Sequence, residues 1–271
     1  MSDPNWLNFM LTDAGKLQRE AVVRRKDHRE LSVSNALVPE YLEDGWEVDR
    51  TLIRKTKLRK PLTHDESLEN KFWYLCYLLG YPEISSGRNF QVRIKRKGAD
   101  AISKQIDVLA KDDETVIVTE CKSSLNITRR TLQKDIEEFS NLKKPIADAI
   151  RNHYGRDFQP KIIWMFVTSN IIWSDQDRTR AKGANIHIVT EKELRYYLQI
   201  ADHLRSAARF QFLAEFLRGQ KIPELEGVKV PAVKGKLGGK TFYSFVSTPR
   251  QMLKIAFVNH RALNDPSGAP S

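Results

Sequence analysis

The chain has 271 residues, of which 41% are hydrophobic, and it carries a formal net charge of +11. This length and apolar content suffice for a sizeable core, in one large domain or one domain with appendages. No apolar run approaches the length of a membrane span and no signal peptide opens the chain, so we expect a cytoplasmic protein without a membrane partner. Cys76 and Cys121 are not spaced as a metal site, and we interpret both as small buried hydrophobes.

The N-terminal part reads as an appendage. Trp6–Arg29 is typical of a helix with a basic end, and Ser32–Leu42 of a connection. The alternation in Gly45–Leu58 predicts an extended arm or strand, which Pro61 closes. We therefore assign residues 1–62 to an N-terminal helix and basic arm.

The next segment, residues 63–200, shows the order helix, three strands, helix, strand. The elements that give this order are Ser67–Leu79, Asn89–Lys95, Gln105–Ala110, Thr115–Ser123, Thr128–Ile150 and Lys161–Thr168. Asp65 or Ser67 is the expected N-cap of the first helix, and Pro145 is expected to bend the second. A short helix from Ser174 to about Gly183, a strand Asn185–Val189 and a helix Glu191–His203, opened by a capping box, complete this predicted α/β domain.

The end of the chain changes character. Residues 201–226 form a predicted helical extension, with a helix over Leu204–Arg218. Residues 227–271 are punctuated by Gly and Pro, strand-like at Lys240–Val246 and helical at Pro249–Ala256, with no core of their own. We interpret this segment as the start of a second, partial domain.

The basic residues gather in two places, which favours a polyanionic partner and nucleic acid before membrane. One cluster precedes the α/β domain, and the other is a segment between Gly227 and Arg261 with seven Lys or Arg and no acid. The bland alternative is a pair of solvated surfaces. The residues we expect to contact phosphates are Arg54, Lys55, Lys57, Arg59, Lys60, Lys234, Lys236 and Lys240.

Three charged residues interrupt two apolar strands that form a predicted hairpin, Gln105–Ala110 and Thr115–Ser123. Asp107 lies on the first, and Glu120 and Lys122 lie on the second, two residues apart and therefore on one face. Burying these charges is costly unless something binds them. Two nearby carboxylates favour Mg²⁺ (or Mn²⁺), which lowers the pKa of bound water and neutralises charge in phosphodiester cleavage. Lys122 can then hold the attacking water or a phosphate oxygen.

The pattern of Asp107 followed by Glu120-x-Lys122 resembles the PD-(D/E)XK nuclease signature, with Ile106 in place of its proline. The resemblance implies the restriction-endonuclease-like αβββαβ core with a mixed central sheet, which agrees with the predicted element order. It also implies metal ligation by Asp107, Glu120 and the Cys121 carbonyl, with Glu69 of the preceding helix completing the set. In Mrr-like members a glutamine follows, here Gln133. The alternatives are helix-dipole stabilisation for Glu69 and a solvated helix face for Gln133.

Four runs carry a more particular resemblance to bacterial DGQHR-domain proteins with an N-terminal nuclease-like region: GWEVDR with KPLTHDESLENKFW, QIDVLA with VTECKSS, ARFQFLAEF, and FYSFVSTPRQMLKIAFVNHR. That family is related to DndB, which is associated with DNA sulfur modification, and occurs in modification and phage-defence neighbourhoods. The DGQHR pentapeptide itself is not in this sequence, so the activity of a complete DGQHR domain is not carried over.

Two functions of different classes remain open. The first is a Mg²⁺-dependent DNA endonuclease of a modification or phage-defence system, for which double-strand cutting predicts a homodimer. The second is a DNA-binding or regulatory module, DndB-like, that cuts nothing. A tRNA-processing or Holliday-junction enzyme of the same fold is a third possibility. The intact set of buried charges favours the first, with DNA, possibly modified, as the substrate.

Overall fold

The computed structural model describes residues 9–96, 99–155, 157–216, 234–237, 240–246 and 255–259. At its centre is a six-stranded sheet in which β9 pairs in parallel with β10, and β10 with β11, while the other neighbours are antiparallel. The predicted mixed central sheet is therefore confirmed. In spatial order its strands are β1 (Met10–Leu11), β5 (Glu83–Ser85), β8 (Val108–Lys111), β9 (Thr115–Thr128), β10 (Lys161–Ile171) and β11 (His187–Thr190).

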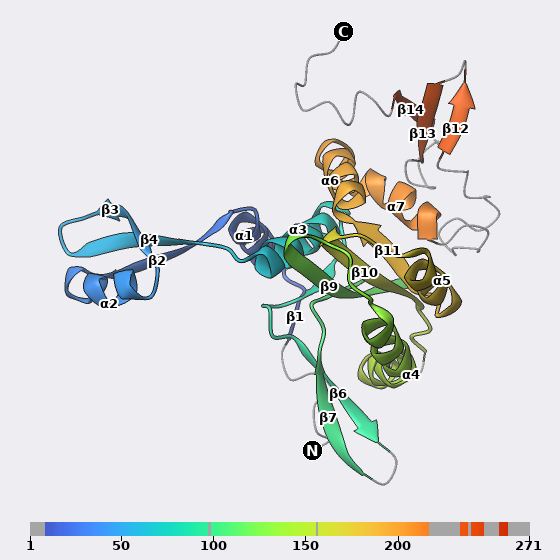
Figure 1. The fold of residues 1–271 in the computed structure, drawn as a ribbon, viewed down its shortest axis with the longest axis horizontal. Coiled ribbons are helices and arrows are strands. Elements are labelled where there is room, and N and C mark those ends of the chain that lie inside the picture. The colour runs from blue at the N-terminus through green and yellow to red at the C-terminus, as the bar shows by residue number, and fades with distance from the viewer. Residues whose placement is uncertain are drawn as a thin grey trace.

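Helices cover both faces of this sheet and divide the core in two (Figure 1). The helices α3 (His64–Leu78), α6 (Glu191–Leu204) and α7 (Ala208–Phe216) pack on one face, and α4 (Gln133–Tyr154) and α5 (Asp175–Gly183) on the other. Strand β9 shows the alternation: Ile117 and Cys121 join the α3 core, and Val116 and Val118 join the α4 core. Both cysteines are buried and free, as predicted.

The restriction-endonuclease-like αβββαβ core is present as α3, β5, β8, β9, α4 and β10. The prediction of its first strand was wrong. The segment predicted as Asn89–Lys95 forms β6 (Gln91–Arg96), which pairs with β7 (Ala99–Gln105) in a separate hairpin. The short β5 occupies the sheet position instead, because it pairs with β8. Apolar alternation marks β6 as a strand but does not tell whether it joins the central sheet.

The predicted strand Gln105–Ala110 is also interrupted. Gln105 ends β7, and β8 begins at Val108. Between them the Ile106 amide donates to the Phe90 carbonyl at 2.9 Å, which ties this point of the chain to the loop before β6. Asp107 therefore sits in a bend at the open end of β8 rather than inside a strand.

Helix α3 begins earlier than predicted. Its N-cap is Thr63, whose hydroxyl accepts the Glu66 amide, while the Glu66 carboxylate accepts the Thr63 amide at 3.0 Å. This capping box satisfies two amides at once, which neither Asp65 nor Ser67 would do. Glu69 consequently lies in the second turn of α3.

Three later helices also test the predicted boundaries. The predicted start of α4 at Thr128 was wrong because β9 continues to Thr128. The helix then runs through Pro145 without interruption, held by an apolar face that includes Ile136, Phe139, Ile146 and Ile150. The predicted start of α5 at Ser174 and the capping box predicted to open α6 are confirmed, with Ser174 and Thr190 as the N-caps.

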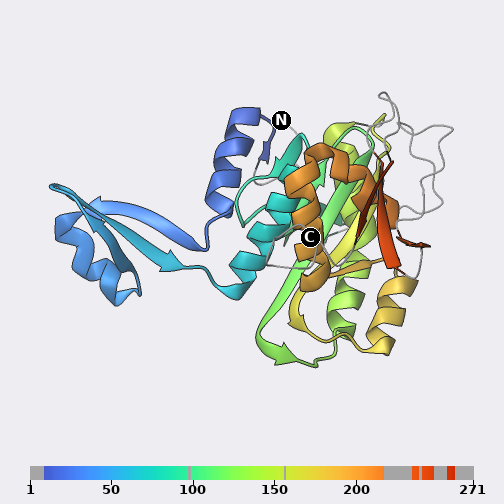
Figure 2. The same cartoon turned by 90° about the horizontal axis from the view of Figure 1, so that it is seen from above.

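The N-terminal appendage contains more strands than predicted. Of the predicted helix Trp6–Arg29 only α1 (Ala14–Arg24) forms, and residues 6–8 lie outside the described part. The predicted connection Ser32–Leu42 overlaps β2 (His28–Ser34), a 3₁₀ turn η1 (Asn35–Leu37) and α2 (Val38–Glu43). The predicted single strand Gly45–Leu58 is two, β3 (Glu47–Thr51) and β4 (Lys55–Pro61). Together with β2 they form a three-stranded sheet in the order β2-β4-β3. This sheet, η1 and α2 make up the arm, which projects from the rest of the protein (Figures 1 and 2).

The C-terminal strands β12 (Lys234–Leu237), β13 (Lys240–Val246) and β14 (Ile255–Asn259) form a separate sheet. The strand prediction at Lys240–Val246 is confirmed. Ile255 and Ala256, predicted as helix, lie in β14, and the rest of Pro249–Ala256 falls outside the described residues. The predicted helix Leu204–Arg218 forms as a 3₁₀ turn η2 (Arg205–Ala207) and α7, and Arg218 lies outside that part. No helix in the described ranges has the length and apolarity needed to cross a bilayer.

Candidate active site

Two carboxylates meet just before the start of β8, beside the middle of β9. The register of this antiparallel pair places Val108 opposite Thr119, so the next pair along is Asp107 opposite Glu120. The Asp107 carboxylate accepts a hydrogen bond from the Cys121 backbone amide, with 2.7 Å between Oδ2 and N. Because of the bend after β7, the Asp107 side chain takes the place of a strand carbonyl and accepts the hydrogen bond from the β9 backbone. This hydrogen bond fixes the carboxylate beside Glu120.

Lys122 lies on the same face of β9 as Glu120, and its ammonium group forms an ion pair with the Glu120 carboxylate. The distance from Lys122 Nζ to Glu120 Oε1 is 2.9 Å, and Asp135 Oδ1 on α4 lies 3.5 Å away. The side chains of Glu120 and Lys122 are 16% and 28% exposed. Burial lowers the pKa of Lys122, but its two carboxylate neighbours raise it more, and the net shift is upward. The side chain therefore remains an ammonium at neutral pH.

The environment of Asp107 disfavours its charged form, whereas that of Lys122 favours its charged form. Burial, followed by repulsion from Glu120, raises its pKa from 3.8 to about 7 in spite of the Cys121 hydrogen bond. Glu69 adds to the repulsion, and Lys122 offsets only part of it. Near neutral pH part of the metal-free protein therefore carries a proton on Asp107. A carboxyl group in that condition, beside a charge partner, indicates a functional site.

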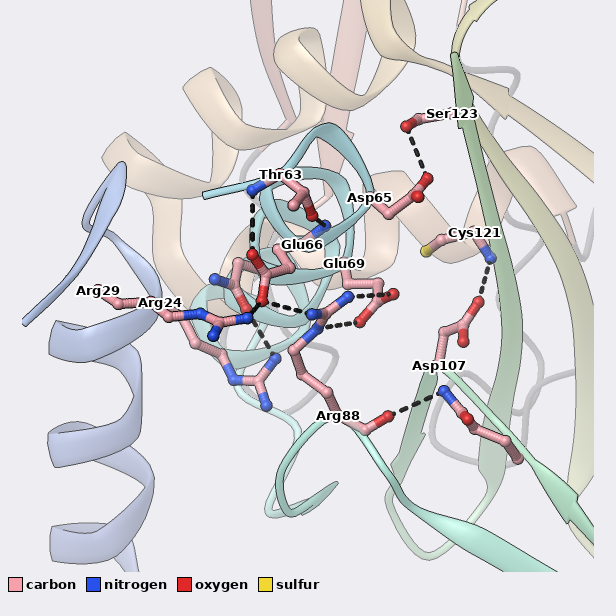
Figure 3. Close-up of polar contacts among 12 residues, drawn as sticks. Arg24, Arg29, Thr63, Asp65, Glu66, Glu69, Arg88, Asp107, Cys121 and Ser123 are labelled. Atoms are coloured by element: carbon pink, nitrogen blue, oxygen red, sulfur yellow. Dashed lines mark hydrogen bonds and ion pairs between the residues drawn. The ribbon is translucent and has the colours of Figure 1, made fainter. Parts of the chain in front are cut away.

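Glu69 extends from α3 toward Asp107 but is bound to Arg88 (Figure 3). Arg88 holds it with two hydrogen bonds, Nε to Oε2 at 2.8 Å and Nη2 to Oε1 at 2.9 Å. A third nitrogen of Arg88 contacts Glu66, which Arg29 also binds. Each carboxylate is almost fully buried, so the arginines supply the charge that makes its burial tolerable.

We expect Arg88→Met to destabilise the fold by about 3 kcal/mol, because it leaves Glu66 and Glu69 buried with too little positive charge. Urea unfolding at pH 7.5 measures the loss. The double variant Arg88→Met/Glu69→Gln should recover a large part of it, since a neutral amide needs no counter-ion. Equal stabilities for the single and double variants would contradict this account of the network.

Gln133 and Cys121 are placed differently from the charged set. Gln133 opens α4 in an exposed position, where its amide donates to Glu137 at 2.8 Å. The Cys121 thiol points into the α3 core, and burial raises its pKa, so only its backbone faces Asp107. Sequence reasoning missed Asp135, which meets Lys122, and Arg88. Glu66 had a signal, the Thr-x-x-Glu capping box, whereas Arg88 follows a loop glycine and carries none.

The protein supplies only some of the ligands that a hard divalent cation needs. Within the described ranges, no three His, Cys, Asp or Glu residues gather closely enough to enclose a metal ion. Asp107 and Glu120 alone do fit Mg²⁺, which takes one or two carboxylates and completes its shell with water and phosphate oxygens. The raised pKa of Asp107 supports this fit, because a cation there would relieve the repulsion that causes the shift.

The predicted phosphate-binding residues lie in two regions, the arm and the C-terminal strands. Lys55, Lys57 and Arg59 alternate on the exposed face of β4, and Arg54 lies in the turn before it. Arg59 binds Glu47 at 3.2 Å, and Lys60 binds the Asp44 carbonyl at 2.5 Å. Lys234 and Lys236 lie on β12, and Lys240 begins β13. The arm therefore presents Arg54, Lys55 and Lys57 without a carboxylate partner among the described residues.

Comparison with known proteins adds little. No protein-family model and no curated protein matches the chain. Among solved structures it is similar to protein VC1899 from Vibrio cholerae, at 17% identity and a TM-score of 0.37 over 72% of this chain and 51% of that one. It is also similar to Can2 from Sulfobacillus thermosulfidooxidans in complex with cyclic tetra-adenylate, at 14% identity and a TM-score of 0.29 over 70% and 50%. The chain spans about half of each, and neither likeness bears on the site.

Proposed function

We propose that the protein is a Mg²⁺-dependent DNA endonuclease of the PD-(D/E)XK type, acting in a DNA modification or phage-defence system. The observation that supports it best is the placement of Asp107 and Glu120 side by side, with Lys122 bound to Glu120 at 2.9 Å. A strand pair with a purely structural role would gain stability from apolar residues at these positions.

The residues of the site have separate roles in this proposal. Asp107 and Glu120 would hold the cation, with the Cys121 carbonyl beside them. When bound, Mg²⁺ supplies a Lewis acid and lowers the pKa of a coordinated water. Lys122 keeps its proton, since its pKa is raised, and donates it as a hydrogen bond to the attacking water or to a non-bridging phosphate oxygen. Gln133, exposed at the start of α4, remains the candidate for the glutamine of Mrr-like members.

Glu69 can join the ligand set only if Arg88 releases it, because both carboxylate oxygens are in use. That observation favours the second candidate function, a DNA-binding or regulatory module that does not cut. In such a module Arg88 would occupy the site permanently, and DNA affinity would not depend on a divalent cation.

The test is to incubate the purified protein with modified and unmodified plasmid in Mg²⁺, Mn²⁺ or EDTA, with Asp107→Asn in parallel. Nicked or linear product that needs the metal and Asp107 supports the nuclease. Binding without product in either metal, on both plasmids, supports the regulatory module.

A further prediction concerns the arm. Lys55→Ala/Lys57→Ala should weaken binding to all DNA sequences alike and reduce the slope of log affinity against log salt by about 2, one unit for each lost phosphate contact. Binding titrations in EDTA between 50 and 200 mM salt measure it. The matched control is Lys192→Ala, an exposed lysine on α6 outside the arm. A slope unchanged by the double substitution would remove the arm from the DNA interface.

A further inference from the structure

The tip of the arm carries an unusual side chain. Strands β3 and β4 are joined by a tight turn, in which the Leu52 amide donates to the Lys55 carbonyl at 2.8 Å. Ile53 in this turn is 97% exposed, whereas its neighbour Leu52 is 40% exposed. The arm extends away from the sheet and its helices in both views (Figures 1 and 2). Its tip therefore holds an aliphatic side chain in water, far from the core.

The turn is held in one conformation. The Asn35 side-chain amide donates to the carbonyls of Leu52 and Ile53 at 3.2 and 3.3 Å. The other atom of the same amide group, Oδ1, accepts the Thr56 hydroxyl at 2.9 Å. Thr56 is buried on the inner face of the arm with Val33 and Leu58. Because the backbone is fixed before any partner arrives, Ile53 is presented with little ordering cost on binding.

Basic side chains near the tip of the arm have no carboxylate partner among the described residues, whereas those nearer its root are paired. Arg50, Arg54, Lys55 and Lys57 are exposed and have no carboxylate partner among the described residues. Arg50 and Lys57 are cross-strand partners and so share a face. Nearer the root, Arg59 is bound to Glu47. An apolar point with cations behind it is complementary to duplex DNA, whose phosphates flank grooves floored by stacked bases.

We propose that the arm docks on duplex DNA and that Ile53 inserts between two base pairs from the minor groove, kinking the duplex. Proteins that bend DNA from this groove use such apolar wedges with cations on the flanking phosphates. Only the turn need enter a groove about 6 Å wide, since the strands behind it contact the backbone. Flexible pyrimidine–purine steps should be preferred, because they unstack at the lowest cost. The proposal takes DNA as the partner from the proposed function.

The experiment uses the full-length protein in EDTA, so that no cleavage occurs. A 30-base-pair duplex carries 2-aminopurine next to a central TA step and a fluorophore pair at its ends. The wild type should raise 2-aminopurine fluorescence and end-to-end energy transfer. Ile53→Ala should abolish both signals and weaken binding about 10-fold, from the apolar burial that is lost. The matched control is Leu42→Ala, which removes an aliphatic side chain that is 45% exposed on α2 of the same arm and should leave both signals unchanged.

Several results would overturn the proposal. Equal fluorescence changes for wild type and Ile53→Ala would do so, as would wild-type binding without unstacking. A fall in molecular mass of the DNA-free protein caused only by Ile53→Ala would assign the tip to contact between two copies of the chain. Kinking without plasmid cleavage would contradict only the proposed nuclease activity. Cleavage with no effect of Ile53→Ala on kinking would contradict only the proposed insertion of Ile53. Because Ile53 lies almost wholly in water, unfolding is not expected to confuse the comparison.

Discussion

Asp107→Asn should abolish plasmid cleavage and, at pH 8 without metal, should make the protein more stable than the wild type. The amide oxygen of Asn can still accept the Cys121 amide, so the hydrogen bond at 2.7 Å is retained. What disappears is the negative charge that Glu120 and Glu69 oppose. Loss of function with gain of stability is expected where a charge is kept for binding rather than for folding.

The pH dependence gives this prediction its sign. The pKa of Asp107 is raised from 3.8 to about 7 by folding, so the folded protein binds this proton more tightly than the unfolded chain does. Between about pH 4 and pH 7 the unfolded chain loses the proton first, and the free energy of unfolding falls as pH rises. The penalty is complete above pH 7 and is of the order of a few kcal/mol. Asp107→Asn should remove that slope.

Thermal melts from pH 4 to pH 8 in EDTA measure the effect, with Asp148→Asn as the control. Asp148 is a half-exposed carboxylate on α4 that pairs with Arg151. Its substitution should change neither the slope nor cleavage, whereas Glu120→Gln should also abolish cleavage. A cutting rate for Asp107→Asn equal to that of the wild type would make the site assignment wrong.

Lys122→Ala should bind DNA nearly as well as the wild type and cut it at least about 100-fold more slowly. A fixed donor aimed at charge that develops in the transition state is worth about 10²–10³ in rate. Lys122→Arg should recover little, because the planar guanidinium is larger and does not act as a compact point charge. Single-turnover cleavage at saturating DNA, with affinity measured in EDTA on the same preparation, separates the two effects.

The chain offers a closely matched control for this lysine. Lys104 binds Glu138 at 2.9 Å and is 27% exposed, against 2.9 Å and 28% for Lys122 with Glu120. It lies on β7, and its carboxylate partner is Glu138 rather than Asp107 or Glu120. Lys104→Ala should therefore cut at close to the wild-type rate. Equal modest losses for the two lysines, in binding and cleavage alike, would favour the regulatory module over the nuclease.

The sequence predicted the central hairpin well because its signal is local. Charges set into an apolar run, two residues apart, fix which face they share, and the structure places Glu120 and Lys122 on that face. The β3–β4 turn was missed because Ile53 and Arg54 are not turn residues. Strand β5 was missed because a strand of three residues has no period to detect. Arg88 was missed because its burial partners come from α3, and no local pattern foretells such a contact.

The root of the arm has a mechanical consequence. The chain enters the arm at β2, where Arg29 binds Glu66, and leaves it just before Thr63, whose amide binds the same carboxylate. The buried Glu66 side chain thus connects both ends of the arm to the first turn of α3. A connection of this kind removes the hinge that a linker would provide. Force applied at the tip is delivered to α3, the helix that also carries Glu69, instead of being absorbed at the root.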